Sequence, residues 1–267
     1  MNRAPTLEEL TIDWFGGEPM LAYNIIKDIM QFSHRLSEKY NFTLISSMTT
    51  NGSLLTLKKL YELNELGVNR FQISFDGNQD LHDKLRITRV GNGSFKIIYR
   101  NLVNLHNSNL RSSIIIRLHL NKNNYEGISK FIDKLSEDFA YDDRFLLFIR
   151  GLSKLGGKND NDLPVIENPE IVKNMITTLT LKARKLHLTL YRDACIMCYD
   201  ASFSEYVIRS DGSIQKCTVA LYDDKNTIWK INEDGTVNIN TDKLTYWVRG
   251  QLSGNPAQLK CPLRSKN

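Results

Sequence analysis

Short apolar segments alternate with amphipathic segments along the first two thirds of the chain, and this alternation constrains the fold most. Most of the short segments end in glycine or polar residues, and the segments between them have helical apolar spacing. Strands buried on both faces and separated by helices are typical of parallel βαβ units. The sequence therefore predicts an α/β fold, either a doubly wound sheet or an incomplete (β/α) barrel. The expected strands are residues 10–15, 42–48, 70–75, 113–120, 144–149 and 188–191, and the expected helices lie in residues 21–40, 54–66, 95–106, 128–135 and 169–185.

Composition excludes several classes of protein. The 267 residues are 41% apolar with a net charge of +5, which is enough to build a core and argues against disorder. Basic residues are scattered, so no nucleic-acid partner is expected. Apolar runs such as residues 113–120 are short, and the first ten residues lack an apolar signal region. We therefore expect a cytoplasmic protein with no membrane partner.

After residue 191 the alternation stops, and a smaller module is expected. Residues 203–209 and 213–217 flank Asp211-Gly212, which predicts a β-hairpin. All four cysteines lie in this part of the chain: Cys195, Cys198, Cys217 and Cys261. Late, clustered cysteines favour a metal site, either zinc or iron–sulfur, over a redox pair or unligated thiols.

Polar and glycine residues follow the expected strands, where ligands of α/β sheets and barrels bind. Glu18, after Gly16-Gly17, either accepts a bond from an ammonium group or begins a helix. Ser74 is suited to a carboxylate or a ribose. Residues 82–86 read as a charged loop in which Arg86 either holds a carboxylate or is solvated.

Arg117 interrupts an apolar strand, and a buried arginine needs an anionic partner. That partner is either a ligand or an internal carboxylate. His119 has the same strand parity and reads as a structural histidine. Asp76-Gly77 is consistent with an ordinary turn.

Taken in order, these segments resemble the radical S-adenosylmethionine (SAM) enzymes. The resemblance rests on residues 10–21, 50–52, 72–77, 82–86 and 91–95. Residues 198–261, with Ser210–Cys217 at their centre, resemble the SPASM domain, which carries auxiliary iron–sulfur clusters. The similarity is strongest to peptide and protein maturases, such as anaerobic sulfatase-maturating enzymes. It implies an incomplete (β/α) TIM-like barrel over residues 1–191 and a SPASM module over residues 192–267.

The resemblance also implies roles for individual residues. Gly16, Gly17 and Glu18 would receive the methionine amino group of SAM, and Thr50 and Asn51 would shape the pocket floor. Ser74 would contact the SAM ribose or carboxylate and Arg86 would approach the SAM carboxylate, with Arg117 and Asn121 as further pocket contacts. Cys198 and Cys217 would ligate an auxiliary cluster, Cys261 would belong to the last cysteine group, and Cys195 would be an extra ligand or a bystander.

Two features depart from the family. Its CxxxCxxC loop, which ligates the [4Fe–4S] cluster that binds SAM, is absent, because residues 1–194 contain no cysteine. The cysteine-rich end of the family is also shorter here. We therefore expect a fragment of a peptide-modifying enzyme, lacking the first strand, exposing an apolar edge and unable to perform the radical step alone. A flavodoxin or ferredoxin would be the electron donor of the whole enzyme. The alternatives are a non-catalytic peptide-binding or partner-binding paralogue and a structural zinc protein.

Overall fold

The computed structural model describes residues 6–88, 90–154, 160–192, 197–237 and 240–262. Contacts divide the chain into two compact units, each with its own hydrophobic core. The first unit comprises Met1–Ser153 and Pro164–Arg192. The second comprises Lys154–Leu163 and Asp193–Asn267.

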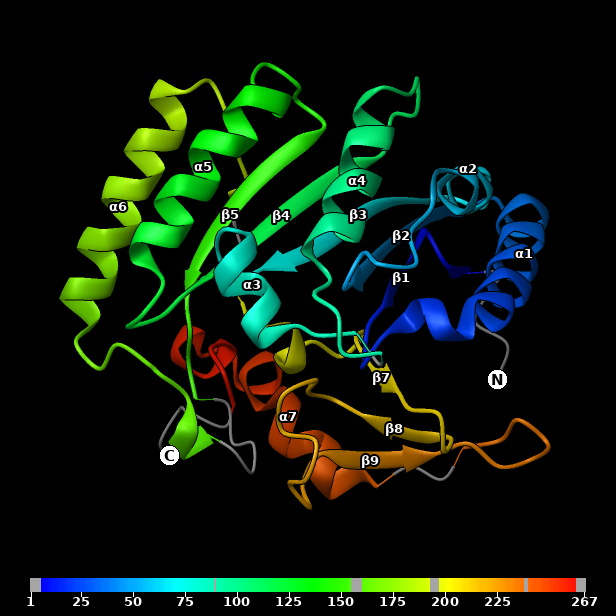
Figure 1. Ribbon diagram of the computed structural model, residues 1–267. Helices are drawn as coiled ribbons and strands as arrows, with labels where there is room; N and C mark the ends of the chain where they lie inside the picture. Colours follow the sequence, from blue (N-terminus) through cyan, green and yellow to red (C-terminus); the bar gives the residue numbers. More distant parts are fainter. Residues whose placement is uncertain (1–5, 89, 155–159, 193–196, 238–239, 263–267) are drawn as a thin grey trace. The chain divides into compact units, whose positions relative to one another are not determined.

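The first unit is built on a six-stranded sheet in which all neighbouring strands are parallel. The strands lie side by side in chain order, as in a (β/α) barrel (Figure 1). Within the described residues β1 and β6 each pair with one neighbour, so the barrel is open. This confirms the predicted α/β fold with an incomplete barrel. The strands are β1 (Glu9–Trp14), β2 (Thr43–Thr50), β3 (Val68–Phe75), β4 (Ser113–Leu120), β5 (Phe145–Gly151) and β6 (Thr189–Leu190).

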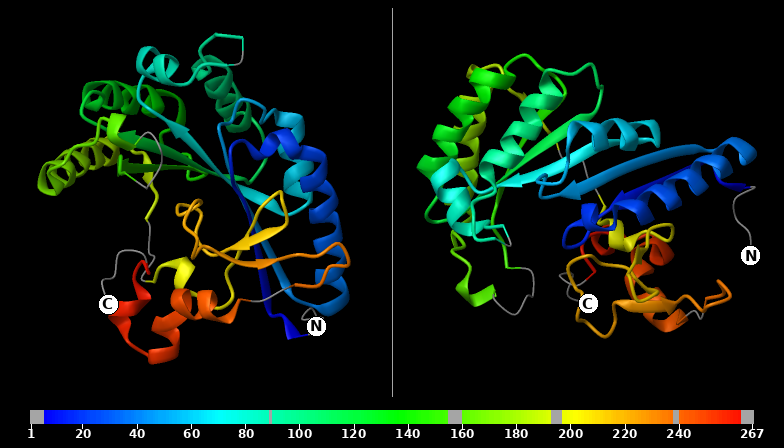
Figure 2. Two further views of the ribbon diagram at one scale, coloured as in Figure 1. Left: turned by 90° about the horizontal axis from the view of Figure 1, so that it is seen from below. Right: turned by 45° about the vertical axis from the view of Figure 1, so that its right-hand side comes forward.

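Helices pack on the outer face of this sheet (Figure 2). Local sequence signals fix their ends. At the start of α6, Pro169 suits the first turn and Asn168 Oδ1 accepts a bond from the Glu170 N–H, while α1 ends at Asn41 in a left-handed conformation (φ 56°). Among the described residues, none of the helices is both long and apolar enough to cross a lipid bilayer. The helices are α1 (Tyr23–Tyr40), α2 (Leu57–Glu65), α3 (Gln79–Leu85), α4 (Phe95–His106), α5 (Tyr125–Phe139) and α6 (Pro169–Lys185), with the 3-10 turn η2 (Pro19–Ala22) before α1.

Strand alternation separates the core from the inner face of the sheet. On β4, Ile116 and Leu118 point toward the helices and are at most 2% exposed. Arg117 and His119 have the opposite parity and are half-buried. Burying such aliphatic side chains stabilises the fold by roughly 1.5–3 kcal/mol each. The same strand thus supplies the core on one face and charged groups on the other.

The prediction of a charged loop over residues 82–86 is wrong for the first four of these residues. The structure has the helix α3 there, and His82 on it is fully buried. Its imidazole packs against Phe75 and Phe95, with ring centroids 5.1 and 5.7 Å away. Because a seven-residue helix is too short to show apolar periodicity, tertiary packing rather than local pattern stabilises it.

The second unit contains a small antiparallel sheet in the order β7-β8-β9, where β7 is Val207–Ile208, β8 is Ser213–Gln215 and β9 is Thr227–Lys230. β7 and β8 form a short hairpin around Asp211-Gly212, where Gly212 has φ +77°. The helix α7 (Thr241–Ser253) buries Trp247 against this sheet. Both β9 and α7 lie where no element was predicted. The unit's short 3-10 turns are η3 (Asp160–Asp162), η4 (Tyr199–Ala201) and η5 (Pro256–Leu259).

Candidate functional site

Glu18 joins the carboxyl ends of β1 and β2. Its Oε1 accepts bonds from Thr50 Oγ1 (2.6 Å) and from the Met20 N–H (3.0 Å), and its Oε2 accepts one from the Asn51 N–H (2.7 Å). A carboxylate has about four acceptor positions, so one stays available to a donor such as an ammonium group. Glu18 thus caps the η2 turn, as one sequence reading predicts, and its binding of an ammonium group stays a prediction.

The turn after β2 brings Thr50 and Asn51 to Glu18. Asn51 Oδ1 accepts bonds from the backbone N–H (2.8 Å) and hydroxyl (2.7 Å) of Ser53. Gly52 adopts φ +79°, and a Cβ there would lie 3.0 Å from Ile98 Cγ2 on α4. The loop therefore lies tightly against the helix layer, and Thr50 and Asn51 serve mainly to fix Glu18.

Gly16 and Gly17 occupy the turn that precedes Glu18. Both are exposed, and no atom lies within 4 Å of a Cβ built at either position. Gly16 adopts φ +141°, a conformation that other residues rarely adopt. The backbone of this turn is therefore open to a ligand beside the Glu18 carboxylate.

Arg117 lies half-buried on the inner face of the sheet, and among the described residues it forms no ion pair with an acidic side chain. Its Nε is buried and has no hydrogen-bond partner among the described residues. Burial, followed by the charges of Arg150 and Arg86, lowers the pKa of Arg117. Ser74 is its register neighbour on β3. A half-buried guanidinium surrounded by like charge attracts an anion, which fits a ligand carboxylate.

Arg86, which follows α3, pairs with Asp76 rather than standing free. Its Nε lies 2.5 Å from Asp76 Oδ2, and the other oxygen of Asp76 lies 3.9 Å from His119 Nδ1. Burial, followed by the charge of Arg117, lowers the pKa of His119 to about 4, so its imidazole is neutral at physiological pH. Sequence analysis treated Asp76 as a turn residue and missed this pair, because only the fold brings the two residues together.

Asn121 and Asn124 shape the turn after β4. Asn121 Oδ1 accepts a bond from the Asn123 N–H (2.8 Å), so its side chain stabilises the turn. Asn124 donates from Nδ2 to the backbone oxygens of Asp76 (2.9 Å) and His119 (2.8 Å), which ties the end of β3 to that of β4. Asn124 was not singled out from the sequence, since an asparagine before a helix usually acts as a cap.

The predicted site residues therefore fall into two groups at the carboxyl ends of the strands. Glu18, Thr50 and Asn51 form one, and no hydrogen bond or ion pair joins them to the other within the described residues. The second group consists of Ser74, Asp76, Arg86, Arg117 and His119. One group therefore contains a carboxylate with an acceptor position left over, and the other contains a guanidinium whose Nε has no hydrogen-bond partner among the described residues.

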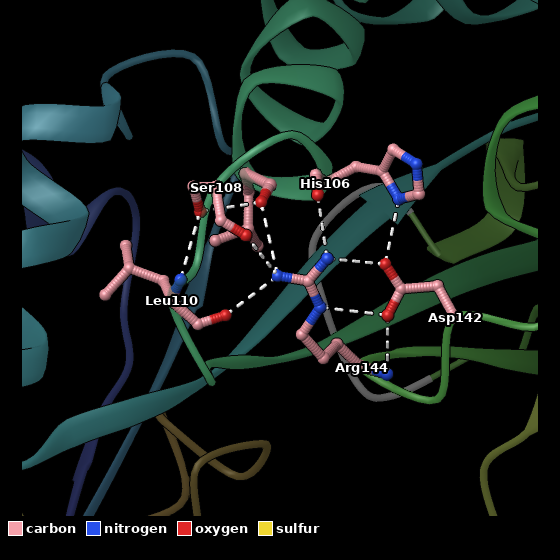
Figure 3. A network of polar contacts seen from close by, with 6 residues as sticks. His106, Ser108, Leu110, Asp142 and Arg144 are labelled. Carbon is pink, nitrogen blue, oxygen red and sulfur yellow. Dashed lines mark hydrogen bonds and ion pairs between the residues drawn. The ribbon is translucent and has the colours of Figure 1, made fainter.

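Arg144 differs from Arg117, because groups of the protein itself pair with its guanidinium. Arg144, just before β5, donates to both carboxylate oxygens of Asp142 (2.7 and 2.9 Å) and to backbone oxygens in the turn after α4, including those of His106, Ser108 and Leu110 (Figure 3). The hydrogen bonds that Arg144 donates to Asp142 raise the pKa of Arg144 further. This cluster is structural, since the protein itself satisfies the guanidinium.

Three of the four cysteines can be examined, because Cys195 lies outside the described residues. Cys198, Cys217 and Cys261 are free thiols. Asp200, which is 2% exposed, lies beside the thiols of Cys198 and Cys217, and its buried Oδ1 has no hydrogen-bond partner among the described residues. Burial, followed by effects of Asp200, raises the pKa of Cys198 to about 12 and that of Cys217 to about 11. Both are therefore protonated at neutral pH unless a cation displaces the proton.

Thiols are suitable ligands for a metal ion or an iron–sulfur cluster, but too few ligands lie together among the described residues to hold one. The Val219 N–H lies 3.4 Å from Cys217 Sγ, the kind of donor that accompanies a ligating thiolate. In the part of the chain that the structure describes, however, no three His, Cys, Asp or Glu side chains are arranged to hold a metal ion. The second unit therefore offers a partial ligand set.

Comparisons with known proteins agree with this arrangement. Residues 9–135 match the family model of the Radical SAM superfamily. The chain is 26% identical over 238 residues to a cysteine-type anaerobic sulfatase-maturating enzyme of Clostridium novyi (strain NT), covering 81% of this chain and 61% of the relative. It is 29% identical over 123 residues to an Fe-coproporphyrin III synthase of Methanosarcina barkeri (strain Fusaro / DSM 804), covering 46% of this chain and 28% of that relative. The match thus spans about three fifths of the maturating enzyme.

Two solved structures share the fold. Native anSMEcpe with bound AdoMet and Kp18Cys peptide superposes with a TM-score of 0.65 at 17% identity, covering 92% of this chain and 69% of that one. SuiB of Streptococcus suis bound to S-adenosylmethionine superposes with a TM-score of 0.55 at 14% identity, covering 91% and 56%. At these identities the likeness establishes the fold.

Proposed function

Since residues 9–135 of this chain form a Radical SAM domain, we propose that it binds S-adenosylmethionine in an enzyme that modifies a peptide or protein substrate. The sequence similarity to a sulfatase-maturating enzyme supports a protein substrate. In enzymes of this family a bound [4Fe–4S] cluster would supply the one-electron chemistry that cleaves SAM. A small redox protein such as flavodoxin or ferredoxin would deliver that electron.

The unpaired guanidinium of Arg117 carries this proposal. The SAM carboxylate would neutralise it, with Arg86 contributing a second positive charge nearby. The SAM ammonium group would use the remaining acceptor position of Glu18 and the open backbone of Gly16-Gly17. Ser74 would donate a hydrogen bond to the ribose or carboxylate. Thr50, Asn51 and Asn121 would keep the pocket walls in place.

The positions of the cysteines determine which iron–sulfur clusters these 267 residues could ligate. Residues 1–194 contain no cysteine, so they provide no thiolate for a cluster beside the SAM pocket. We infer that the chain, purified as these residues, binds SAM but does not cleave it. Cys198, Cys217, Cys261 and Cys195 would contribute to auxiliary iron–sulfur ligation. Formation of 5′-deoxyadenosine by the reconstituted, reduced chain would contradict this inference.

Isothermal titration calorimetry with SAM tests the pocket. We expect Arg117→Met to weaken SAM binding about tenfold or more, because a charge-assisted bond to the carboxylate is lost. Arg100→Met, on the exposed side of α4, is the matched control and should leave the affinity unchanged. Equal affinities for the wild type and Arg117→Met, with both proteins folded by circular dichroism, would refute the assignment.

A further inference from the structure

Hydrogen bonds of the backbone and of two side chains join the two ends of the segment from His82 to Phe95. The Arg86 N–H donates to the backbone oxygen of His82 (2.8 Å), as the last turn of α3. The Arg86 carbonyl accepts from both the N–H (3.2 Å) and the hydroxyl (2.9 Å) of Ser94. Ser94 Oγ in turn lies 3.0 Å from His82 Nε2. Both peptide groups that flank the Arg86 side chain are therefore fixed.

A second connection closes the same segment. Asp83 Oδ1 accepts a bond from the Phe95 N–H (2.8 Å) at the start of α4. A Cβ at Gly93 would lie 2.1 Å from the Asp83 carboxylate carbon, so only glycine permits this contact. The residues at 83, 93, 94 and 95 thus hold the end of α3 against the beginning of α4.

Hydrogen bonding also fixes the protonation state of His82. Because the Ser94 hydroxyl donates to the Arg86 carbonyl, it accepts from His82, and the ring proton lies on Nε2. His82 Nδ1 is buried and has no hydrogen-bond partner in the part of the chain that the structure describes. Burial, followed by the charge of Arg86, lowers the pKa of His82 to about 4 against the opposing effects of Asp76 and Asp83. The connection therefore persists across the physiological pH range.

Side-chain packing holds His82 and Phe95 at the two ends of this segment, but it does not hold the residues on either side of Arg86. Leu85 is 64% exposed and Ile87 is 66% exposed, so the neighbours of Arg86 on both sides face solvent. An arginine in such a segment would lose roughly 2 kcal/mol of side-chain entropy on pairing. Its guanidinium nevertheless lies 2.5 Å from Asp76. The hydrogen bonds of His82 and Ser94 are what keep its backbone in place.

We propose that His82 and Ser94 are positioning residues, which hold the backbone of Arg86 so that its guanidinium stays paired with Asp76 and oriented for the anionic end of the ligand. The second half of this proposal rests on the proposed function, SAM binding. The first half concerns this chain alone. It assigns a role in orienting Arg86 to the hydrogen bonds of His82 and Ser94.

Arginine side-chain NMR tests the positioning without any ligand. In protein labelled with ¹⁵N-arginine, the Nε–H signal of Arg86 is assigned through Arg86→Lys, and its exchange with water is measured. We expect Ser94→Ala to speed this exchange at least about tenfold and to weaken SAM binding about fivefold. Ser94→Thr, which keeps the hydroxyl, should restore both values. His82→Leu should behave like Ser94→Ala, and His82→Gln should retain part of the protection.

Ser108→Ala is the matched control. Ser108 follows α4 as Ser94 precedes it, and its hydroxyl also donates to a backbone oxygen, that of Leu105 (2.7 Å). It should lower the melting temperature without changing the Arg86 signal. Unchanged Arg86 exchange in both Ser94→Ala and His82→Leu would overturn the proposal. If the wild type does not bind SAM while Arg86 exchange responds as expected, the proposed function fails and the positioning role stands.

Discussion

At the scale of single residues, the side chain of Asn226 holds the loop that carries Cys217 in place through hydrogen bonds to its backbone. Its Oδ1 accepts from the backbone N–H groups of Lys216 (3.0 Å) and Cys217 (2.8 Å). Its Nδ2 donates to the backbone oxygens of Cys217 (2.8 Å) and Ala220 (2.9 Å). The side chain is fully buried, so no water replaces these bonds if it is removed. The position of the Cys217 thiol therefore depends on an amide nine residues away.

Asn226→Ala should destabilise the second unit by about 2–4 kcal/mol, because several backbone groups lose their buried partner. Urea unfolding followed by tryptophan fluorescence measures the loss, and hydrogen exchange over residues 213–230 locates it. Asn232→Ala is the control, since the side chain of the half-buried Asn232 bonds only locally to Thr236 (2.8 Å to Oγ1) and should cost under about 0.5 kcal/mol. A similar cost for both variants would show that Asn226 has no special role.

Sequence reasoning identified Glu18 and Arg117 because each stands out locally, one after a glycine pair and the other inside an apolar strand. It could not tell which arginine is free. In the sequence Arg86 lies in a charged segment and Arg117 inside an apolar strand, and neither position shows whether a carboxylate reaches the side chain. Only the fold shows that Asp76 pairs with Arg86 and that Arg117 has no hydrogen-bond partner for its Nε within the described residues.

At the scale of secondary-structure elements, β4 was predicted at its observed bounds, since a parallel strand buried among helices is apolar along its whole length. The expected β6 was longer than the observed strand, because only Thr189 and Leu190 pair with β5. The helix α3 was missed. Its stability comes from contacts of His82 with Phe75 and Phe95 on other elements, and no local pattern records these.

Asp142 links the start of β5 to the end of α4 and should make the stability of the first unit depend on pH. Burial alone would raise its pKa, but hydrogen bonds from Arg144 and His106 lower it below the ordinary value of 3.8. Because the folded pKa is the lower one, the stabilisation is complete above that ordinary value. It is lost as the pH falls through the folded pKa.

Asp142→Asn should therefore cost about 2 kcal/mol at pH 7, and the difference from wild type should shrink between about pH 4 and pH 2. Urea unfolding at a series of pH values measures it. Asp143→Asn is the control, because Asp143 is exposed and adjacent but forms no hydrogen bond to Arg144 in the structure. A cost for Asp142→Asn that stays constant down to pH 2 would mean that the charge of Asp142 does not contribute.

At the scale of the whole molecule, the first unit exposes an apolar stripe at one edge of its sheet. Leu21, Ile25, Ile29 and Phe32 are 67%, 59%, 41% and 55% exposed. The last three follow helical spacing along α1, whose opposite face is already buried in the core. A helix that is apolar on both faces is typical of one covered on both sides. Within the described residues, the neighbouring strand β1 also has one unpaired edge.

This surface should make the 267-residue chain self-associate. Burying about four large apolar side chains per copy favours association, and the unpaired edge of a strand can form hydrogen bonds with another copy. Sedimentation velocity should detect species larger than a monomer at micromolar concentration. The double variant Ile25→Lys, Phe32→Glu should shift the protein toward monomer. The control, Ile171→Lys with Leu181→Glu, changes two similarly exposed side chains of α6 that do not share one helix face, and it should leave association unchanged. A wild-type protein that stays monomeric at all concentrations would contradict the expectation. If both double variants reduce association equally, general surface charge rather than the apolar stripe governs it.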